Sequence, residues 1–540
     1  MALIEIKNLS FSYPGCSETI KNINLSVEQG DFVALFGPTG SGKTTLLRLL
    51  KPELSPLGET EGSILFGGKE IKELSQAESS AIGFVQQSTE HQTVTDKVWH
   101  EIAFGMENLN YSQGLMSRRM AEVSAYFGID GIFESKTSEI SGGQKQLVAL
   151  ASIAALDPEV IILDEPTSQL DPISANEFLN ALKKLNSESG VTIIISEHRL
   201  ENVIPLCSKI CAIDGGEIKA YGPVRETAEK LLKDSKMLPY LPGSARLYSL
   251  LGGEGPCPLS VTEGRTYLKK NTLPLFTEEK ASDDKAEKEP AVEFKKVYFR
   301  YDKDSDDVLR GTDITAYKNE ILCILGANGS GKTTMLCCAA GLLTPYSGKI
   351  RLFGKDIKKY KNSELYGGVI SYLPQNPEIL FMKNTLREEM EESGIDFKDI
   401  PFDLSYAADI HPYDLSGGER QMAAIAKVMA SKPEILLLDE PTKGLDPKAK
   451  RDICEVLKKL KEDGITIIAV THDVEFAALC ADRAAMFFRG AVTCTDKPRE
   501  FFSENIYYTT SISKITRDYA EGIITDNDLA KYIKPEDRSR

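Results

Sequence analysis

Short, largely apolar runs recur along the chain, each bounded by glycine or polar residues. Phe32 to Phe36, Val160 to Leu163 and Val191 to Ser196 are strand-sized, and largely apolar runs of this length are typical of strands buried on both faces of a parallel sheet. Helical spacing then begins at Leu46 after the first run. The alternation of buried strands with helices predicts an α/β fold built on a parallel sheet.

The same pattern occurs a second time. Ile321 to Leu325, Ile435 to Asp439 and Ile465 to Thr471 repeat the three runs in the same order, and the motifs beside them recur almost letter for letter. The chain is therefore a duplication. The interval from Gln375 to Ser416 is shorter than its counterpart in the first copy, which predicts that a helical insert is reduced in the second copy.

Composition narrows the class of protein. The 540 residues carry 64 Lys and Arg against 80 Asp and Glu, a net charge of −16, with 41% hydrophobic and 27% charged residues. This balance fits a globular protein and argues against a general nucleic-acid coat, which usually needs basic faces. No apolar run approaches the roughly 18–20 residues that cross a bilayer, and the N-terminus does not read as a signal peptide. The ten cysteines are scattered, so we expect free thiols in a reducing compartment.

Each first strand leads into a glycine-rich loop and then a helical pattern. Gly37 to Thr45 reads Gly-Pro-Thr-Gly-Ser-Gly-Lys-Thr-Thr, and Gly326 to Thr334 reads Gly-Ala-Asn-Gly-Ser-Gly-Lys-Thr-Thr. In this context the loop is a P-loop, whose backbone N–H groups surround phosphate oxygens. We expect the loop lysine to reach the β- and γ-phosphates of a nucleotide and the next threonine to bind Mg²⁺. These residues are Lys43 and Thr44 in the first copy, and Lys332 and Thr333 in the second.

Acidic pairs end the second strand of each copy. Asp164 and Asp439 lie at the strand end, where a carboxylate can hold Mg²⁺ through water. Glu165 and Glu440 come next and are placed to orient or deprotonate an attacking water. An acidic pair that only caps the turn before the following proline is the alternative.

A histidine follows the third strand of each copy, at His198 and His472. A lone histidine is usually a surface or core residue. Because two of only five histidines occupy matching places after matching strands, we expect them to sense the γ-phosphate.

Ser-Gly-Gly precedes a helical pattern in both copies, at Ser141 to Gln144 and Ser416 to Glu419. Its backbone N–H groups can bind phosphate at the helix N-terminus, and a flexible turn is the alternative. Since each copy already has a P-loop, a second phosphate-binding turn indicates a composite site.

Taken together, the motifs resemble those of ATP-binding-cassette (ABC) ATPases in both halves, nearly end to end. A glutamine after a strand (Gln87; Gln375) and an aspartate after the acidic pair (Asp171; Asp446) complete the family's set in the family's order. The resemblance implies an α/β fold with two tandem P-loop NTPase domains. Each domain would have a RecA-like parallel-sheet core, an antiparallel β-subdomain near the adenine and a helical subdomain that carries Ser-Gly-Gly.

The resemblance also implies how the residues act together. Both cofactors, ATP and Mg²⁺, would lie between the halves, with ATP on each P-loop capped by the other copy's Ser-Gly-Gly, so that the two domains pair head to tail within one molecule. Tyr13 and Tyr301 match the aromatic that stacks on adenine; a tyrosine at the edge of the core is the alternative. The residues expected to bind ATP are Tyr13, Gly37, Gly40, Gly42, Lys43, Thr44, Thr45, Gln87, Ser141, Gly142, Gly143, Gln144, Tyr301, Gly326, Gly329, Gly331, Lys332, Thr333, Thr334, Gln375, Ser416, Gly417, Gly418 and Glu419. The expected Mg²⁺ ligands are Thr44, Gln87, Asp164, Thr333, Gln375 and Asp439, the catalytic residues are Glu165, Glu440, His198 and His472, and the D-loop residues are Asp171 and Asp446.

The repeat continues past the catalytic core into a small helical appendage on each copy. The predicted boundaries are a first ATPase domain at 1–230, an appendage at 231–276, a charged linker at 277–291, a second ATPase domain at 292–502 and a C-terminal appendage at 503–540. The linker is rich in Glu, Asp and Lys and has few apolar anchors, which is typical of a solvated tether.

Two segments resemble importers of the energy-coupling-factor (ECF) type, which take up vitamins and metal ions: Glu-Ile-Ala-Phe-Gly, ending at Gly105, and Glu-His-Arg-Leu-Glu, starting at Glu197. That resemblance implies a cytoplasmic protein, peripheral on the inner face of the cell membrane. Its partners would be a coupling transmembrane protein, received in a groove bordered by Gln87, Glu90 and Gln375, and a substrate-binding membrane protein. No nucleic-acid partner is expected.

Other cassette proteins remain alternatives. A ribosome-associated translation factor of the ABC-F kind would carry a long basic arm between its halves, whereas this linker is short and acidic-leaning. A sugar-importer ATPase usually has one degenerate site, and both sites here keep every element. A DNA-repair cassette would carry zinc-binding cysteine clusters, and no cysteines have that spacing.

Overall fold

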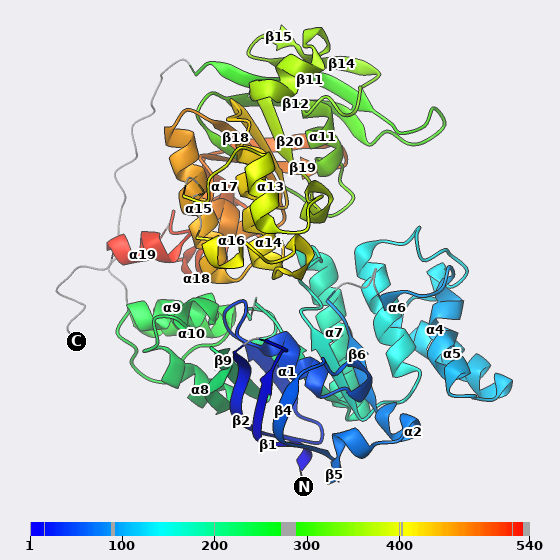
Figure 1. The fold of residues 1–540 in the computed structure, drawn as a ribbon. Coiled ribbons are helices and arrows are strands. Elements are labelled where there is room, and N and C mark those ends of the chain that lie inside the picture. The colour runs from blue at the N-terminus through cyan, green and yellow to red at the C-terminus, as the bar shows by residue number, and fades with distance from the viewer. Residues whose placement is uncertain are drawn as a thin grey trace. The chain divides into compact units, whose positions relative to one another are not determined.

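In the computed structural model the chain forms two compact units: unit 1 is residues 1–249 with 253–260, and unit 2 is residues 250–252 with 261–540 (Figure 1). The structure describes residues 2–15, 17–87, 92–198, 200–271, 288–398, 400, 403–520 and 522–532. Glu90 and residues 277–287 of the predicted linker lie outside this described part.

Unit 1 contains two sheets. The antiparallel sheet has the order β2-β1-β4-β5 and is formed by β1 (Ala2–Ser12), β2 (Glu18–Glu28), β4 (Glu59–Phe66) and β5 (Lys69–Glu70). The core sheet has the order β10-β9-β3-β8-β7-β6 and is parallel except at β10. Its strands are β3 (Phe32–Phe36), β6 (Ile82–Val85), β7 (Val160–Asp164), β8 (Thr192–Ser196), β9 (Lys209–Asp214) and β10 (Glu217–Pro223).

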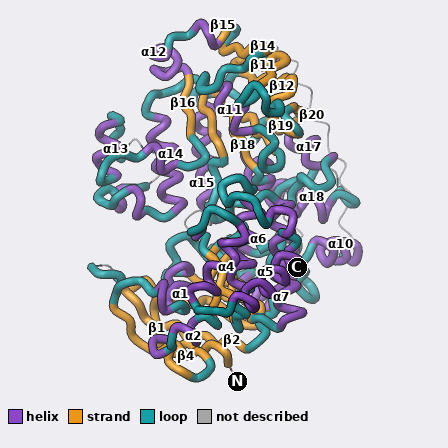
Figure 2. Tube along the Cα trace, turned by 90° about the vertical axis from the view of Figure 1, so that its right-hand side faces the viewer, coloured by secondary structure: helices purple, strands orange, loops and turns teal. Residues whose placement is uncertain are grey.

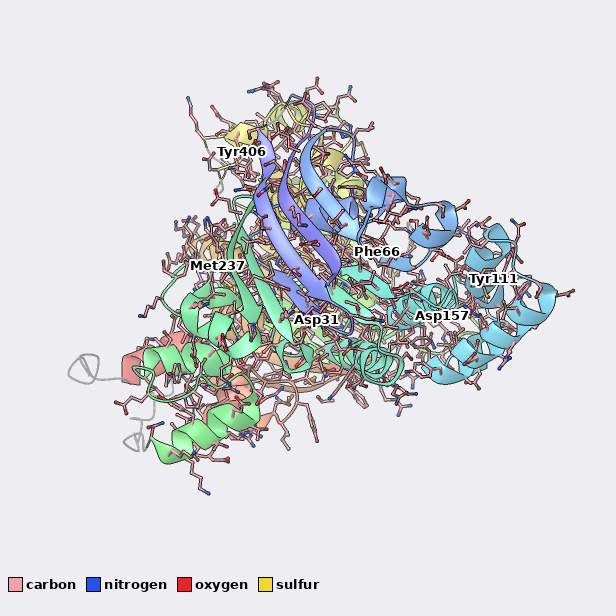
Figure 3. The ribbon with its side chains drawn as sticks, turned by 90° about the horizontal axis from the view of Figure 1, so that it is seen from below. Asp31, Phe66, Tyr111, Asp157, Met237 and Tyr406 are labelled. Carbon is pink, nitrogen blue, oxygen red and sulfur yellow. The ribbon has the colours of Figure 1, made fainter. Side chains whose placement is uncertain are left out.

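The helices of unit 1 include a helical subdomain inserted between β6 and β7. It consists of α4 (Val98–Asn108), α5 (Gln113–Phe127) and α6 (Gly142–Ala154). Tyr111, between α4 and α5, and Asp157, after α6, both lie toward the right of Figure 3. Arg119 on α5 joins these two places, since it lies over the Tyr111 ring and pairs with Asp157 at 3.4 Å. The remaining helices are α1 (Lys43–Leu49), α2 (Gln76–Ser79), α7 (Pro172–Ser189), α8 (Val224–Leu231) and α9 (Gly243–Leu250), whose last residue is grouped with unit 2.

Unit 2 repeats both sheets. Its antiparallel sheet has the order β12-β11-β14-β15, and its core sheet has the order β16-β17-β18-β13-β19-β20, parallel except at β20. The antiparallel strands are β11 (Pro290–Phe299), β12 (Leu309–Tyr317), β14 (Ser347–Leu352) and β15 (Lys355–Asp356). The core strands are β13 (Ile321–Leu325), β16 (Ile370–Leu373), β17 (Ile435–Asp439), β18 (Thr466–Thr471), β19 (Arg483–Phe488) and β20 (Ala491–Asp496).

The helices of unit 2 include one that precedes the linker in sequence, α10 (Val261–Lys270). In the described part of the interval between β16 and β17, the long helix α14 (Gly417–Met429) is preceded by the short α13 (Leu386–Glu392) where unit 1 has α4 and α5. The other helices are α11 (Lys332–Ala339), α12 (Asn362–Glu364), α15 (Pro447–Glu462), α16 (Val474–Cys480), α17 (Pro498–Glu504), α18 (Ser511–Thr516) and α19 (Asp526–Tyr532).

The core sheet of unit 2 is covered on both faces (Figure 2). Ile321, Cys323 and Leu325 of β13 join a buried cluster with α14, α15 and α16, whereas Leu322 and Ile324 join a cluster with α11 and the antiparallel sheet. Since side chains alternate across a strand, a run buried on both faces must be apolar at every position, as the sequence predicts. In the described part of the chain, no helix combines the length and apolar character needed to span a membrane.

Candidate functional site

The predicted site residues of unit 1 gather at one edge of the core sheet. Strands β3, β7 and β8 are parallel neighbours in the order β3-β8-β7, so the segments after their carboxyl ends lie side by side. The P-loop follows β3, Asp164 ends β7 and Ser196 ends β8. The topology thus brings together residues far apart in the sequence, as expected for the ligand edge of an α/β sheet.

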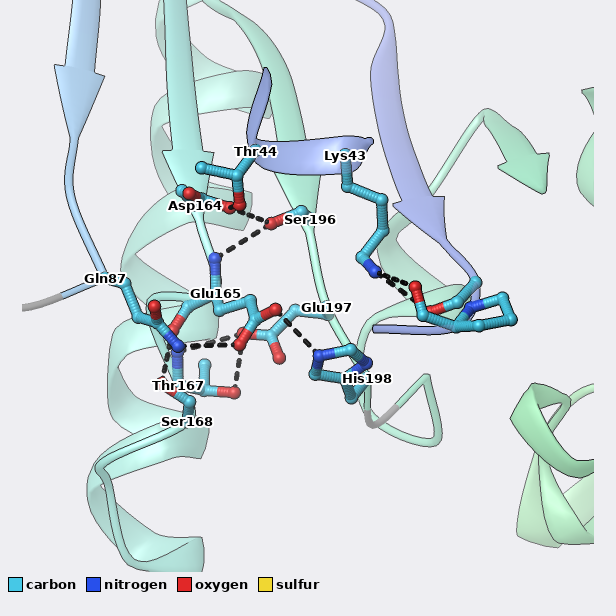
Figure 4. A network of polar contacts seen from close by, with 12 residues as sticks. Lys43, Thr44, Gln87, Asp164, Glu165, Thr167, Ser168, Ser196, Glu197 and His198 are labelled. Carbon is cyan, nitrogen blue, oxygen red and sulfur yellow. Dashed lines mark hydrogen bonds and ion pairs between the residues drawn. The ribbon is translucent and has the colours of Figure 1, made fainter. Parts of the chain in front are cut away.

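Glu165 lies at the centre of a polar network (Figure 4). Its carboxylate accepts a hydrogen bond from Gln87 Nε2 at 2.8 Å, and its second oxygen lies 2.7 Å from His198 Nε2. Both Glu165 and His198 are buried. The structure therefore joins the three predicted residues directly, with the histidine and the glutamine fixing the orientation of the carboxylate.

The backbone is strained at both glutamates that the sequence predicts to be catalytic. Glu165 has a φ of 44° and Glu440 a φ of 51°, in the left-handed region that residues other than glycine rarely adopt. The amide N–H groups hold this conformation by donating to the carbonyl oxygens of Ser196 and Val470, at 3.1 and 2.9 Å. Strain of this kind persists only where the surroundings over-determine it and is typical of functional sites.

Asp164 is placed to bind a cation together with Thr44. Ser196 Oγ donates to Asp164 Oδ1 at 2.7 Å, and Thr44 Oγ1 donates to the same oxygen at 3.1 Å. Burial and the neighbouring charge of Glu165 raise the pKa of Asp164, so a bound cation would relieve an unfavourable concentration of negative charge. A hydroxyl and one carboxylate fit Mg²⁺, which takes few protein ligands and keeps waters and substrate phosphates as the rest.

Two residues of this network were missed by sequence reasoning as site residues. Ser196 links Asp164 to the backbone N–H of Glu165, which donates to Ser196 Oγ at 2.9 Å. Glu197, with 2% of its surface exposed, accepts hydrogen bonds from Thr167 N at 2.9 Å and Thr167 Oγ1 at 2.7 Å, and so holds the turn after Glu165. Ser196 ends β8 and Glu197 follows it, so that two polar residues come directly after three isoleucines; this is the signal that would have found them.

Unit 2 repeats the central pair. His472 Nδ1 lies 2.9 Å from Glu440 Oε2, which also accepts from Thr471 Oγ1 at 3.3 Å. Burial opposes ionisation of Glu440, but the charge and hydrogen bonds of His472, with the charge of Lys332, outweigh it and lower its pKa. The lowered pKa keeps this carboxylate ionised.

The carboxylates at the strand ends have different partners in the two units. In unit 1, Ser196 of β8 stands opposite Asp164; in unit 2, the residue opposite Asp439 on β18 is Val470. On the other neighbouring strand, Tyr372 of β16 takes the place that Phe84 has on β6. Tyr372 OH donates to Asp439 Oδ2 at 3.3 Å. Burial raises the pKa of Asp439 to about 6, and within the described residues its Oδ1 is buried with no hydrogen-bond partner. This buried oxygen, on a carboxylate that also interacts with Thr333, fits a Mg²⁺ ligand.

The tyrosines predicted to meet adenine lie beside the P-loops. Tyr13 OH is 3.1 Å from Thr45 Oγ1, and Tyr301 OH is 3.1 Å from Thr334 Oγ1. Each ring is held edge-on by a phenylalanine two residues earlier, and 62% of the surface of Tyr301 is exposed. An oriented, accessible ring of this kind can stack on a planar base.

The Ser-Gly-Gly segments form helix starts. Ser141 and Gln144 cap α6 with reciprocal hydrogen bonds, and Ser416 and Glu419 do the same for α14. These contacts are local and, in the described part of each unit, do not join the glutamate network. The carboxylate of Glu419 additionally accepts hydrogen bonds from Ser416 Oγ at 2.6 Å and Tyr406 OH at 2.6 Å.

The predicted D-loop aspartates also begin helices. Asp171 accepts from the N–H groups of Ile173 and Ser174 and caps α7, and Asp446 accepts from Ala449 N and caps α15. Each therefore fixes the direction of the helix that follows the acidic pair.

The first P-loop glycine is required by its surroundings. Gly37 has a φ of 147°, and a Cβ there would lie 1.9 Å from the carbonyl oxygen of Ile213. We expect Gly37→Ala to destabilise unit 1 by about 2 kcal/mol or more through strain and overlap, measured by denaturant unfolding. Gly142→Ala is the matched control, because its Cβ meets nothing within 4 Å; equal stability losses in both variants would contradict this reading of the loop.

A P-loop lysine, a threonine–aspartate pair and a histidine-bound glutamate on the ligand edge of a parallel sheet define a P-loop ATPase, present here twice. The family described as ABC transporter matches residues 20–168 and 309–443. The chain is 38% identical to an ABC transporter ATP-binding protein of Bacillus anthracis over 98% of both chains. It is 32% identical to another of Methanosarcina acetivorans over 92% of this chain and 85% of that protein. The chain belongs to the ABC transporter family of ATP-binding proteins and is a tandem ABC ATPase.

A solved structure has a similar arrangement of the chain. The archaeal ribosome recycling factor aABCE1, in its complex with the ribosomal stalk protein aP1, aligns with a TM-score of 0.57, covering 92% of this chain and 91% of its own. At 20% identity this likeness shows a shared fold and nothing about function.

Proposed function

We propose that the chain is the ATP-hydrolysing, energy-coupling subunit of an ECF-type membrane importer for a vitamin, a metal ion or another micronutrient. It would lie on the cytoplasmic face of the cell membrane and bind a coupling transmembrane protein, which would in turn act with a substrate-binding membrane protein. The transporter names of its relatives support the broad role. The ECF type rests on the resemblance of the segments around Glu101 and Glu197.

The observation that carries the proposal is an exposed apolar side chain just before α4 in unit 1 and just before α13 in unit 2, on backbone that a buried glutamate binds. In unit 1 this side chain is Val94, which is 65% exposed. Its loop is fixed by Glu101 of α4, which is 8% exposed and accepts from Val94 N at 3.1 Å, Thr95 N at 2.8 Å and Thr95 Oγ1 at 2.9 Å. A buried carboxylate thus holds the loop while the apolar side chain faces solvent.

Unit 2 builds the same device with different residues. Met382 is 84% exposed, and Glu389 of α13, which is fully buried, accepts from the backbone N–H groups of Met382 and Lys383 and pairs with Lys427. Ile379, in the short 3₁₀ helix Pro377–Leu380 that precedes this loop, is 63% exposed. Exposed apolar residues on a preorganised loop are typical of a docking surface, and we assign these two loops to the membrane partner.

ATP would supply the energy at two sites built from residues of both halves. Lys43 and Lys332 would neutralise the phosphates, and Thr44 with Asp164 and Thr333 with Asp439 would hold Mg²⁺, which would draw charge from the β- and γ-phosphate oxygens. Glu165 and Glu440 would orient the attacking water and accept its proton. Ser141 and Ser416 would complete the phosphate sites of the opposite halves.

Copurification tests the importer assignment. The tagged chain is co-expressed with the products of its genomic neighbours, extracted from membranes in mild detergent and isolated; we expect an integral membrane subunit to accompany it. Val94→Asp combined with Met382→Asp should abolish this association without lowering the basal ATPase rate. Leu57→Asp combined with Tyr507→Asp is the matched control, since both residues are exposed apolar positions on other loops.

The opposite outcome is equally clear. A chain that stays free of membrane subunits and instead sediments with ribosomes in low-salt lysate would contradict the importer role and favour a translation factor.

A further inference from the structure

Helix α10 precedes the charged linker in sequence but packs in unit 2. Its buried face lies on α18: Gly264 and Leu268 are buried, and a Cβ at Gly264 would lie 3.1 to 3.2 Å from side-chain atoms of Ile515. Arg265 Nε donates to the carbonyl oxygen of Lys514 at 2.8 Å. A ten-residue helix is marginal on its own, so this packing accounts for its order.

The segment just before α10 is held by unit 1. Cys257 N donates to Glu229 Oε1 at 3.1 Å, and Arg225 donates to the carbonyl oxygen of Cys257; both partners lie on α8. Tyr248 OH donates to the carbonyl oxygen of Gly253 at 2.9 Å. The chain therefore passes from unit 1 to unit 2 between Cys257 and Arg265.

This placement changes the role of the charged linker. Both α10 before it and β11 after it belong to unit 2, so the linker joins two parts of the same unit. Cutting the linker would leave α10 joined to unit 1 through the chain and bound to α18 of unit 2 by noncovalent contacts alone.

We propose that α10 is a clasp: a helix carried by the first ATPase half that binds the α18 surface of the second half and keeps the halves together independently of ATP and of the linker. The buried face of α10 supplies the binding, with Gly264 against Ile515 and with Leu268 buried on the same face, and Arg265 fixes the position of the helix along α18. The two halves would thus stay associated both with and without bound nucleotide.

Cleavage of the full-length protein tests the clasp. A recognition sequence for a site-specific protease is inserted between Ser282 and Asp283, the purified protein is cut, and the products are run on size exclusion in nucleotide-free buffer with EDTA. The two fragments are expected to elute together. Separation of the fragments into two peaks would overturn the proposal.

Variants on α10 assign the association to this helix. Gly264→Leu in the cut protein is expected to separate the fragments, because the new side chain overlaps Ile515, while leucine favours the helix more than glycine does. Arg265→Ala should raise the apparent dissociation constant of the fragments by about 10- to 100-fold, as loss of one charge-assisted hydrogen bond predicts. Thr266→Leu, on the exposed face of α10, should have no effect. Fragments that stay together in Gly264→Leu, or part in Thr266→Leu, would contradict the clasp.

Discussion

Replacing both Glu165 and Glu440 by glutamine is expected to lower the rate of ATP hydrolysis by at least about 100-fold, as loss of a general base predicts. Glutamine keeps the shape of the side chain but cannot accept the proton of the attacking water. In both units the carboxylate lies within 2.9 Å of a histidine nitrogen, so the replaced group is fixed where the chemistry needs it. The steady-state release of phosphate measures the effect.

The single variants separate the two sites. Glu165→Gln and Glu440→Gln are each expected to leave partial activity, because the other half keeps its own carboxylate and histidine. Glu53→Gln is the control, since Glu53 pairs with Lys51 away from the network, and it should hydrolyse ATP at the unmodified rate. An intact rate in the double variant would remove both glutamates from the chemistry.

Lys43→Ala and Lys332→Ala are each expected to weaken ATP binding at the altered site by about 10- to 100-fold. This is the effect expected when hydrogen bonds to a charged group are lost. Both ammonium groups are buried and donate to P-loop carbonyl oxygens: Lys43 Nζ to Gly37 and Pro38, at 2.9 Å each, and Lys332 Nζ to Gly326 and Ala327. The loop therefore holds each ammonium group beside the place where we expect the phosphates to bind. Equilibrium titration with a non-hydrolysed ATP analogue measures the affinity.

Lys51→Ala is the matched control for the lysine variants. Lys51 is also partly buried and donates to a backbone carbonyl, that of Ser79 at 2.7 Å, but it does not lie on the P-loop. Its removal should leave the ATP affinity unchanged. Equal losses in the control and in Lys43→Ala would mean that the effect comes from the fold and not from phosphate binding.

Much of the fold follows from local sequence. Val160 to Asp164 is apolar at every position before its carboxylate because β7 is buried on both faces, and this pattern predicts the strand and the place of Asp164 together. The P-loop is equally local, since its lysine and threonine begin the helix that the loop leads into. Within the residues that the structure describes, the reduced helical insert of the second copy is also confirmed, by α13 in place of α4 and α5.

Other features depend on contacts that no single segment encodes. Two hydrogen bonds form only because β6, β7 and β8 are neighbours in the sheet. They are the bond from Gln87 to Glu165 and the bond from Thr167 N to Glu197. The strand-end aspartate accepts a hydrogen bond from Ser196 in unit 1 and from Tyr372 in unit 2. Only the strand register reveals this difference. The position of α10 in unit 2 rests on packing against α18, which lies far along the chain and leaves no local signal.

The most direct test of a duplicated, complete ATPase is the number of ATP molecules bound by the Glu165→Gln, Glu440→Gln chain in the presence of Mg²⁺. Hydrolysis is blocked in this variant while the P-loops, the tyrosines and the strand-end aspartates are intact. Equilibrium dialysis with labelled ATP should give two ATP molecules per chain. One molecule, or none, would contradict the presence of two complete sites.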